Sequence, residues 1–293
     1  MNVIGELKEQ FRKGTNLLKL IYINSAVFIV MAVLQIIAVL SNNPAIASSV
    51  VEFLAVPASS SNLLMKPWTV ITYMFLHEGF FHILFNMLWL YWFGRIFSDY
   101  LDQKKLVSVY ILGGLSGALF YILSFNVFPA FSEIIHVSIA LGASASVMAI
   151  VIATAVYIPD YSVHLFLLGR VKIKYIALGI FLLTTVFDFS VNTGGKIAHI
   201  GGAAFGYIYA LRYKQGKDMG KWLSNLIDSI ATWFKPRQKM KVSYKKPMND
   251  LEYNEMKADH QEKIDRILEK ISKGGYDSLT KEEKEILFRE GQK

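Results

Sequence analysis

The chain has 293 residues, of which 53% are hydrophobic and only 18% are charged, and its mean hydropathy is positive. A soluble domain of this length interrupts its apolar residues with a solvated face, so this composition argues against one and favours a membrane protein. The chain contains no cysteine, which excludes disulfides, thiolate metal ligands and a cysteine nucleophile.

The formal net charge is +8, a value that could indicate a nucleic-acid-binding protein. However, the basic residues cluster beside hydrophobic segments and in the C-terminal tail. This placement suits the anionic inner leaflet of a membrane better, so we expect no nucleic-acid partner.

The long apolar segments predict an all-α, polytopic membrane protein with six transmembrane helices and a long first external loop. Each segment is near the roughly 20 residues that cross a bilayer. The predicted spans are 17–40, 79–97, 105–125, 142–158, 173–188 and 196–213. The first span begins too deep in the chain and is too long for a cleavable signal peptide, so we expect it to be retained.

The basic residues also predict the orientation. They lie in the N-terminal segment and after the second, fourth and sixth spans, whereas the opposite loops hold only Lys66 and Lys196. Because cytoplasmic loops are enriched in Lys and Arg, both termini are predicted to be cytoplasmic.

Two connections between the predicted spans have features of their own. Residues 41–78 contain Trp68 and are expected to lie partly in the outer interface. Alternation within 163–175 predicts a small cytoplasmic β-hairpin.

Two regions follow the membrane domain, which we assign to residues 1–213. Residues 214–248 carry nine Lys or Arg against two acidic residues. Their apolar residues, including Trp222 and Trp233, recur at helical spacing. This pattern predicts a basic amphipathic helix on the anionic inner leaflet; packing against another protein element is the alternative.

Residues 249–293 predict a small helical cytoplasmic tail. A first helix carries one apolar stripe, which ends at Gly274-Gly275; the stripe consists of Ile264, Ile267, Leu268 and Ile271. A second helix follows, with Thr280 and Glu283 at the spacing of a capping box. The tail shows no catalytic constellation.

Polar residues occur near the beginning of three apolar segments. Asn86 and His82 lie in the second segment, Ser144 in the fourth and His199 in the sixth. Even-numbered spans start from the same side of the membrane, so these residues are expected to converge near the outer face. Polar groups inside a bilayer are costly and usually mark function. A hydroxyl, an imidazole and an amide donor are the parts of an acyl-transfer site.

Ser144 follows Gly142 and Ala143, whose small size allows a substrate backbone or another helix to come close. Free backbone N–H groups in the first helical turn could bind an oxyanion. Considered alone, a membrane serine more often caps the helix or bonds across it than acts as a nucleophile. Ser146 competes for the role of nucleophile, but it lies deeper in the segment.

His199 precedes Gly202 and Gly206, which have the small-xxx-small spacing of closely packed membrane helices. If the sixth span packs against the fourth, the imidazole can take the serine proton as a general base. The alternative is a structural histidine in an interhelix contact. We expect Asp188 only to cap or solvate its helix end, which leaves a Ser–His dyad.

His82 and Asn86 are four residues apart and share a helix face, so both could complete an oxyanion hole. His77 lies five residues before His82, about 140° around a helix, and is assigned a structural role at the helix end. Zinc proteases need two histidines four apart, and this spacing breaks that geometry. We therefore expect no metal and no cofactor.

Together, these residues resemble the rhomboid family of intramembrane serine proteases over about residues 15–213. The motifs are His77-x4-His82-x3-Asn86, Gly142-Ala143-Ser144, and Ala198-His199 with Gly202. The resemblance implies a Ser144–His199 dyad, and an oxyanion hole formed by His82, Asn86 and the Ser144 amide. It also implies cleavage of membrane proteins with a single transmembrane helix. Substrates would enter beside the second and fifth spans, under the loop at 190–195.

Three positions depart from the family pattern. Ala145 replaces the usual glycine after the serine, and Met148 stands where many members have an aromatic residue that stacks on the histidine. Trp68-Thr69 replaces a common Trp-Arg pair. None of these changes removes a reacting group, although the last two affect histidine positioning and loop anchoring.

The sequence therefore predicts an intramembrane serine endopeptidase of the bacterial inner membrane that acts near the outer face. One alternative is an inactive rhomboid-like protein that binds membrane helices without cutting them. The presence of Ser144, His199 and Asn86 together argues against it. A transporter or channel would require ionisable residues at the bilayer centre and broken helices, and neither is evident.

Overall fold

The computed structural model describes residues 11, 13–165, 169–187, 192–233 and 249–290. The chain divides into two compact units, residues 1–235 and 236–293, which are described separately. The predicted domain limits at 213 and 248 stay a prediction.

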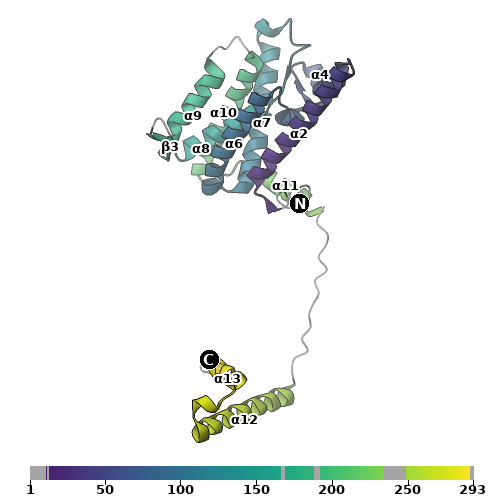
Figure 1. The fold of residues 1–293 in the computed structure, drawn as a ribbon. Coiled ribbons are helices and arrows are strands. Elements are labelled where there is room, and N and C mark those ends of the chain that lie inside the picture. The colour runs from purple at the N-terminus through teal and green to yellow at the C-terminus, as the bar shows by residue number, and fades with distance from the viewer. Residues whose placement is uncertain (1–10, 12, 166–168, 188–191, 234–248, 291–293) are drawn as a thin grey trace. The chain divides into compact units, whose positions relative to one another are not determined.

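The first unit is the helical bundle of a multi-pass membrane protein (Figure 1). Its main helices are α2 (Asn16–Leu40), α6 (Phe80–Leu101), α7 (Gln103–Val127), α8 (Ser144–Tyr157), α9 (Ile173–Phe181) and α10 (Thr193–Lys214). A π-helical segment, η3 (Leu182–Val186), continues α9. Each helix overlaps one predicted span, which confirms the all-α bundle. Within the described residues, α2, α6 and α7 are long and apolar enough to cross a membrane by themselves.

Helix α8 lies inside the bundle. It has only 14 residues, ten of which are buried, and it contacts α6, α7, α9 and α10. A helix enclosed by its neighbours is expected to be largely apolar, and all of its residues except Ser144, Ser146 and Thr154 are apolar. Its first turn is therefore held by neighbouring helices.

The connection between α2 and α6 is folded. It contains α3 (Ala45–Leu54), β1 (Val56–Pro57), α4 (Ser60–Met65), α5 (Thr69–Thr72) and a 3-10 turn, η1 (Tyr73–Phe75). A second 3-10 turn, η2 (Pro129–Phe131), follows α7, and β1 pairs antiparallel with β2 (Ile139–Ala140). The Trp68 indole donates to the Phe53 carbonyl at 2.8 Å. The connection is thus fastened to the segment that leads into α8.

The predicted hairpin within 163–175 is confirmed. Strands β3 (Ser162–Leu165) and β4 (Gly169–Lys172) pair antiparallel, with His164 opposite Arg170. The ammonium groups of Lys172 and Lys174 lie 2.8 and 3.2 Å from the Asp160 carboxylate and hold its pKa below the ordinary value. These ion pairs join the start of the hairpin to its end.

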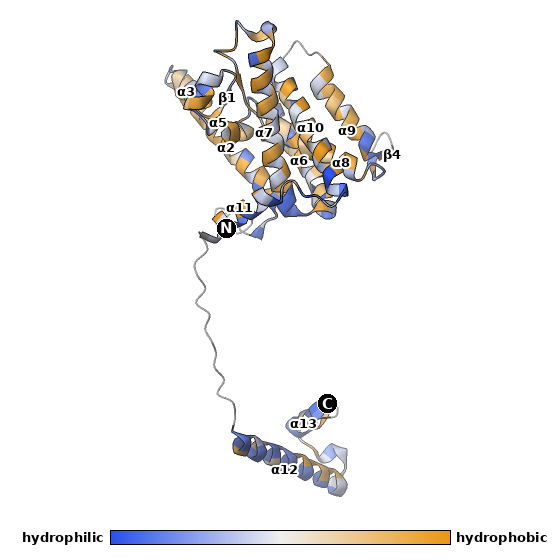
Figure 2. Ribbon diagram, turned by 180° about the vertical axis from the view of Figure 1, so that it is seen from behind, coloured by the Kyte–Doolittle hydropathy of each residue, from blue (hydrophilic) through white to orange (hydrophobic). Residues whose placement is uncertain are grey.

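Helix α11 (Lys221–Trp233) is the described part of the predicted amphipathic segment; residues 234–248 lie outside the described residues. It packs on α7, where the Ser224 and Ser108 hydroxyls lie 2.7 Å apart and Lys104 pairs with Asp228 at 2.7 Å. Trp222, by contrast, is 59% exposed. Helix α11 therefore shows features of both alternatives: it packs against α7, and it leaves the apolar Trp222 side chain exposed. Hydrophilic residues gather at the end of the bundle that carries α11 and β4 (Figure 2).

The second unit consists of α12 (Asp250–Gly274), the 3-10 turn η4 (Tyr276–Ser278) and α13 (Lys281–Glu290). The predicted capping box is confirmed, because the Thr280 N–H donates to Glu283 at 2.7 Å and the Glu283 N–H donates to Thr280 at 3.3 Å. In the predicted stripe, Ile267 is buried and Ile264 and Ile271 are half-buried, whereas Leu268 is 50% exposed. Leu268 is about 100° around the helix from Ile267, at the opposite edge of the stripe.

Candidate active site

Ser144 is the first residue of α8, immediately after a sharp turn. Gly142 has φ +131°, a conformation that glycine adopts without steric cost. Its N–H donates to the Tyr73 carbonyl at 2.9 Å, which fixes the turn to η1. A Cβ built on Gly142 would lie only 3.0 Å from the His82 ring and 3.6 Å from the Ser144 hydroxyl oxygen. The glycine thus keeps space open between these two side chains.

The two serines of this turn occupy different environments. Ser144 is half-buried and lines a small pocket, whereas Ser146 is fully buried. The Ser146 hydroxyl lies against α7, only 2.5 Å from where a Cβ on Gly114 would be, and it has no hydrogen-bond partner among the described residues. Of these two serines, Ser144 is the one that lines the pocket.

His199 lies in the second turn of α10, and its Nδ1 is 3.2 Å from the Thr184 carbonyl oxygen. Thr184 belongs to the π-helical segment η3, where the regular helical bonding pattern is interrupted. With Nδ1 donating to this carbonyl, Nε2 carries the lone pair and can accept a proton. A backbone carbonyl thereby takes the place of an acidic residue that would orient the histidine.

Two glycines bring α10 against α8. A Cβ on Gly202 would fall on the carbonyl group of Ala145, and one on Gly206 would fall on that of Ala149. The small-xxx-small contact expected between the fourth and sixth spans is therefore present. It sets His199 beside the first turn of α8.

Ser144, His199 and Asn86 line one pocket of about 40 Å³. Residues from α6, α8, α9 with its extension η3, and α10 complete its wall; they are Trp89, Val147, Met148, Val151, Ile180 and Thr184. Within the described residues, no hydrogen bond joins the Ser144 hydroxyl to the His199 ring. Catalytic hydrogen bonds often tighten only when substrate binds.

The remaining predicted residues lie around this pocket. The Asn86 amide donates to the His82 carbonyl at 2.8 Å, which leaves its second N–H for another acceptor. The rings of His77 and His82 pack edge to face, 5.1 Å apart. His77 is 6% exposed, and neither of its ring nitrogens has a partner in the described structure. It supports His82 and does not line the pocket.

Asp188 and the first part of the loop at 190–195 lie outside the described residues. Within the described ranges, no group of three or more His, Cys, Asp or Glu side chains could hold a metal ion. The sequence did not identify Trp89 or the Thr184 carbonyl. In the sequence, Trp89 has the pattern of an ordinary membrane-facing residue. The position of a backbone carbonyl cannot be inferred from the identity of the side chain.

The chain resembles known protein families over two regions, one of which contains the pocket. The Rhomboid domain family matches residues 65–215, and a family of unknown function, DUF6576, matches residues 249–290. The chain is 29% identical over 161 residues to "RHOMBOID-like protein 12, mitochondrial" of Arabidopsis thaliana, covering 51% of this chain and 47% of that protein. It is 26% identical over 161 residues to "Rhomboid protease AarA" of Providencia stuartii, covering 50% and 56%. The chain spans about half the length of the curated relatives it matches.

Proposed function

This chain belongs to the rhomboid family, and we propose that it is an intramembrane serine endopeptidase with a Ser144–His199 dyad. The observation that carries the proposal is the single pocket shared by a half-buried serine, a histidine and a buried amide from three different helices. The similarity to a protein named as a rhomboid protease supports the same activity.

In the proposed mechanism, the Ser144 oxygen attacks the substrate carbonyl carbon while His199 Nε2 takes the hydroxyl proton. The Thr184 carbonyl holds Nδ1–H and stabilises the imidazolium that forms. The carbonyl oxygen of the substrate becomes an oxyanion, which accepts hydrogen bonds from the Ser144 N–H, Asn86 and His82. Collapse of this intermediate breaks the peptide bond, and the imidazolium protonates the leaving amine. Water then attacks the acyl-enzyme by the same route and regenerates Ser144.

We further propose that the substrates are membrane proteins with a single transmembrane helix. The basic loops support an orientation with both termini in the cytoplasm and the pocket near the outer face of a bacterial inner membrane. The exposed Trp222 on α11 supports contact between residues 214–248 and anionic lipid of the inner leaflet.

The experiment that tests the proposed activity uses the full chain in lipid vesicles with a helical single-span substrate. We expect cleavage within or beside the transmembrane segment, at the end nearest the outer face, with the site located by mass spectrometry of the fragments. Binding of the substrate helix without any cleavage would instead support the inactive rhomboid-like alternative.

Replacement of Asn86 by alanine is expected to lower kcat by about 10²–10³-fold, with a much smaller effect on KM, because it removes a donor to the oxyanion. The measurement is steady-state cleavage of the same substrate in vesicles. If KM rose while kcat stayed constant, Asn86 would contribute to substrate binding and not to oxyanion stabilisation.

Deletion of Leu183 is expected to lower kcat at least tenfold, because it removes the extra residue from the π-helical segment and turns the Thr184 carbonyl away from His199. Leu183 is 69% exposed, so its side chain contributes little to the packing of the segment. Leu183→Ala, which truncates the side chain without changing the helical register, is the matched control and should retain activity. If the deletion variant were as active as the unmodified chain, the Thr184 carbonyl would not be needed to position His199.

A further inference from the structure

A second cavity, of about 490 Å³, lies between α6, the β3–β4 hairpin and the beginning of α9. Trp89, Trp92 and Ile96 follow one face of α6 along its wall, and Ile173 and Ile176 of α9 lie across from them. Its volume is in the range of small-molecule ligand sites. Trp92 is 46% exposed on a membrane-spanning helix, so the cavity opens toward the bilayer.

The polar groups of this cavity are at its hairpin end. Arg95 is three residues beyond Trp92 on α6, toward the end of the helix, and His164 of β3 also lines the cavity. No Asp or Glu is among the described residues that line it. Arg95 is exposed and forms no ion pair in the described part of the chain. An apolar slot with an unpaired cation at one end is complementary to an amphiphile with an anionic head group.

We propose that this cavity binds one anionic phospholipid, with its phosphate at Arg95 and an acyl chain along Trp89 and Trp92. Basic pockets between transmembrane helices on the cytoplasmic side are recognised sites for anionic head groups. The cation at one end of an apolar slot decides for a lipid with an anionic head group over a neutral one.

The test measures lipid binding to the full chain in neutral detergent. Phosphatidylglycerol and phosphatidylcholine with the same brominated chains are titrated, and quenching of tryptophan fluorescence reports contact with the acyl chains. We expect tighter binding of phosphatidylglycerol. In Trp92→Phe part of the quenching should be lost, because Trp89 remains beside the acyl chain. Arg95→Gln should weaken phosphatidylglycerol binding about fivefold or more and leave phosphatidylcholine unchanged, whereas Arg95→Lys should keep most of the preference.

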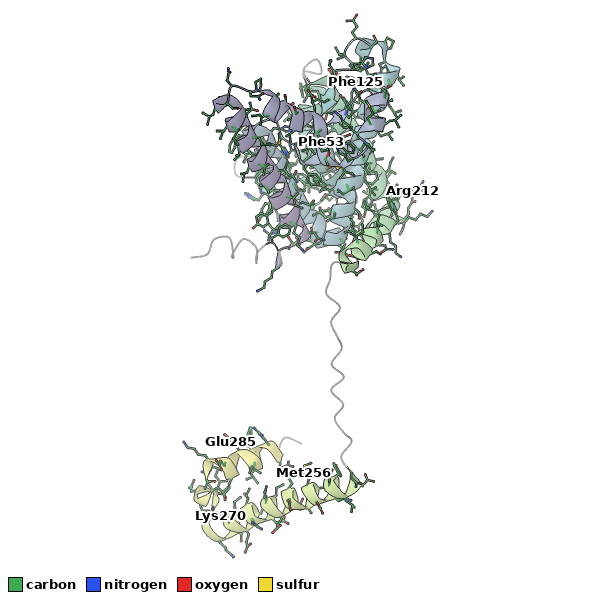
Figure 3. All side chains as sticks on the ribbon, turned by 90° about the vertical axis from the view of Figure 1, so that its right-hand side faces the viewer. Phe53, Phe125, Arg212, Met256, Lys270 and Glu285 are labelled. Carbon is green, nitrogen blue, oxygen red and sulfur yellow. The ribbon has the colours of Figure 1, made fainter. Side chains whose placement is uncertain are left out.

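Arg212→Gln is the matched control, because Arg212 lies at the end of α10, outside the cavity and on the outside of the bundle (Figure 3). Its binding curve should match that of the unmodified chain. Equal affinity for both lipids, an unchanged curve for Arg95→Gln in a protein with unchanged thermal unfolding, or binding of glycerol phosphate as tight as that of phosphatidylglycerol would each overturn the proposal. No substrate turnover is measured, so the result is independent of the proposed proteolysis.

Discussion

Replacement of Ser144 by alanine is expected to abolish cleavage, with kcat lower by at least about 10⁴-fold, because the nucleophile is removed and only binding and oxyanion contacts remain. The measurement is cleavage of a helical single-span substrate by the full chain in vesicles. The substrate should still bind, since the change removes one oxygen atom from a half-buried side chain.

Ser146→Ala is the matched control for this experiment. It removes a hydroxyl two residues away that is buried against α7 and has no partner in the described structure. Its loss should leave both cleavage and thermal stability nearly unchanged. If Ser146→Ala were the inactive variant and Ser144→Ala were active, the assignment of the nucleophile would be wrong.

Replacement of Gly202 by alanine is expected to reduce cleavage more than tenfold and to lower the temperature of thermal unfolding. The added methyl group would overlap the Ala145 carbonyl, with the carbonyl carbon only 2.8 Å away. Both partners are helix backbone, so α10 must move away from α8 at a cost of about 1–3 kcal/mol. That movement separates His199 from Ser144, and small displacements of catalytic groups cause large losses of rate.

Gly179→Ala provides the comparison for this variant. Gly179 is also in a helix of the bundle, α9, but a Cβ there would meet no atom within 4 Å. Alanine has the higher helix propensity, so this variant should be as stable as the original or more so and should remain active. Full activity of Gly202→Ala would show that close packing of α8 and α10 is not needed.

The sequence was sufficient to predict the six helices of the bundle and three polar residues that line the pocket, each from a different helix. Long apolar runs specify membrane helices because no other structure satisfies the backbone inside a bilayer. Asn86, Ser144 and His199 were noticeable because polar groups at such positions are costly. The close contact at Gly202 was also predictable, since its spacing from Gly206 is one helical turn.

Other features depend on three-dimensional contacts that no local pattern encodes. The π-helical segment Leu182–Val186 has no distinctive composition, so the carbonyl that faces His199 could not be predicted. The pairing of β1 with β2 joins residues about 80 positions apart, through strands of two residues each. Leu268 follows the apolar pattern of α12, and only the folded unit shows that it is half exposed whereas Ile267 is buried.

Covalent labelling with a serine-directed fluorophosphonate, followed by mass-spectrometric mapping of the modified residue, tests the dyad most directly. The proposed arrangement predicts modification of Ser144 in the full chain, and a much slower reaction in His199→Ala because no base takes the hydroxyl proton. Modification of Ser146 or of another serine, or a rate at Ser144 that does not depend on His199, would contradict it.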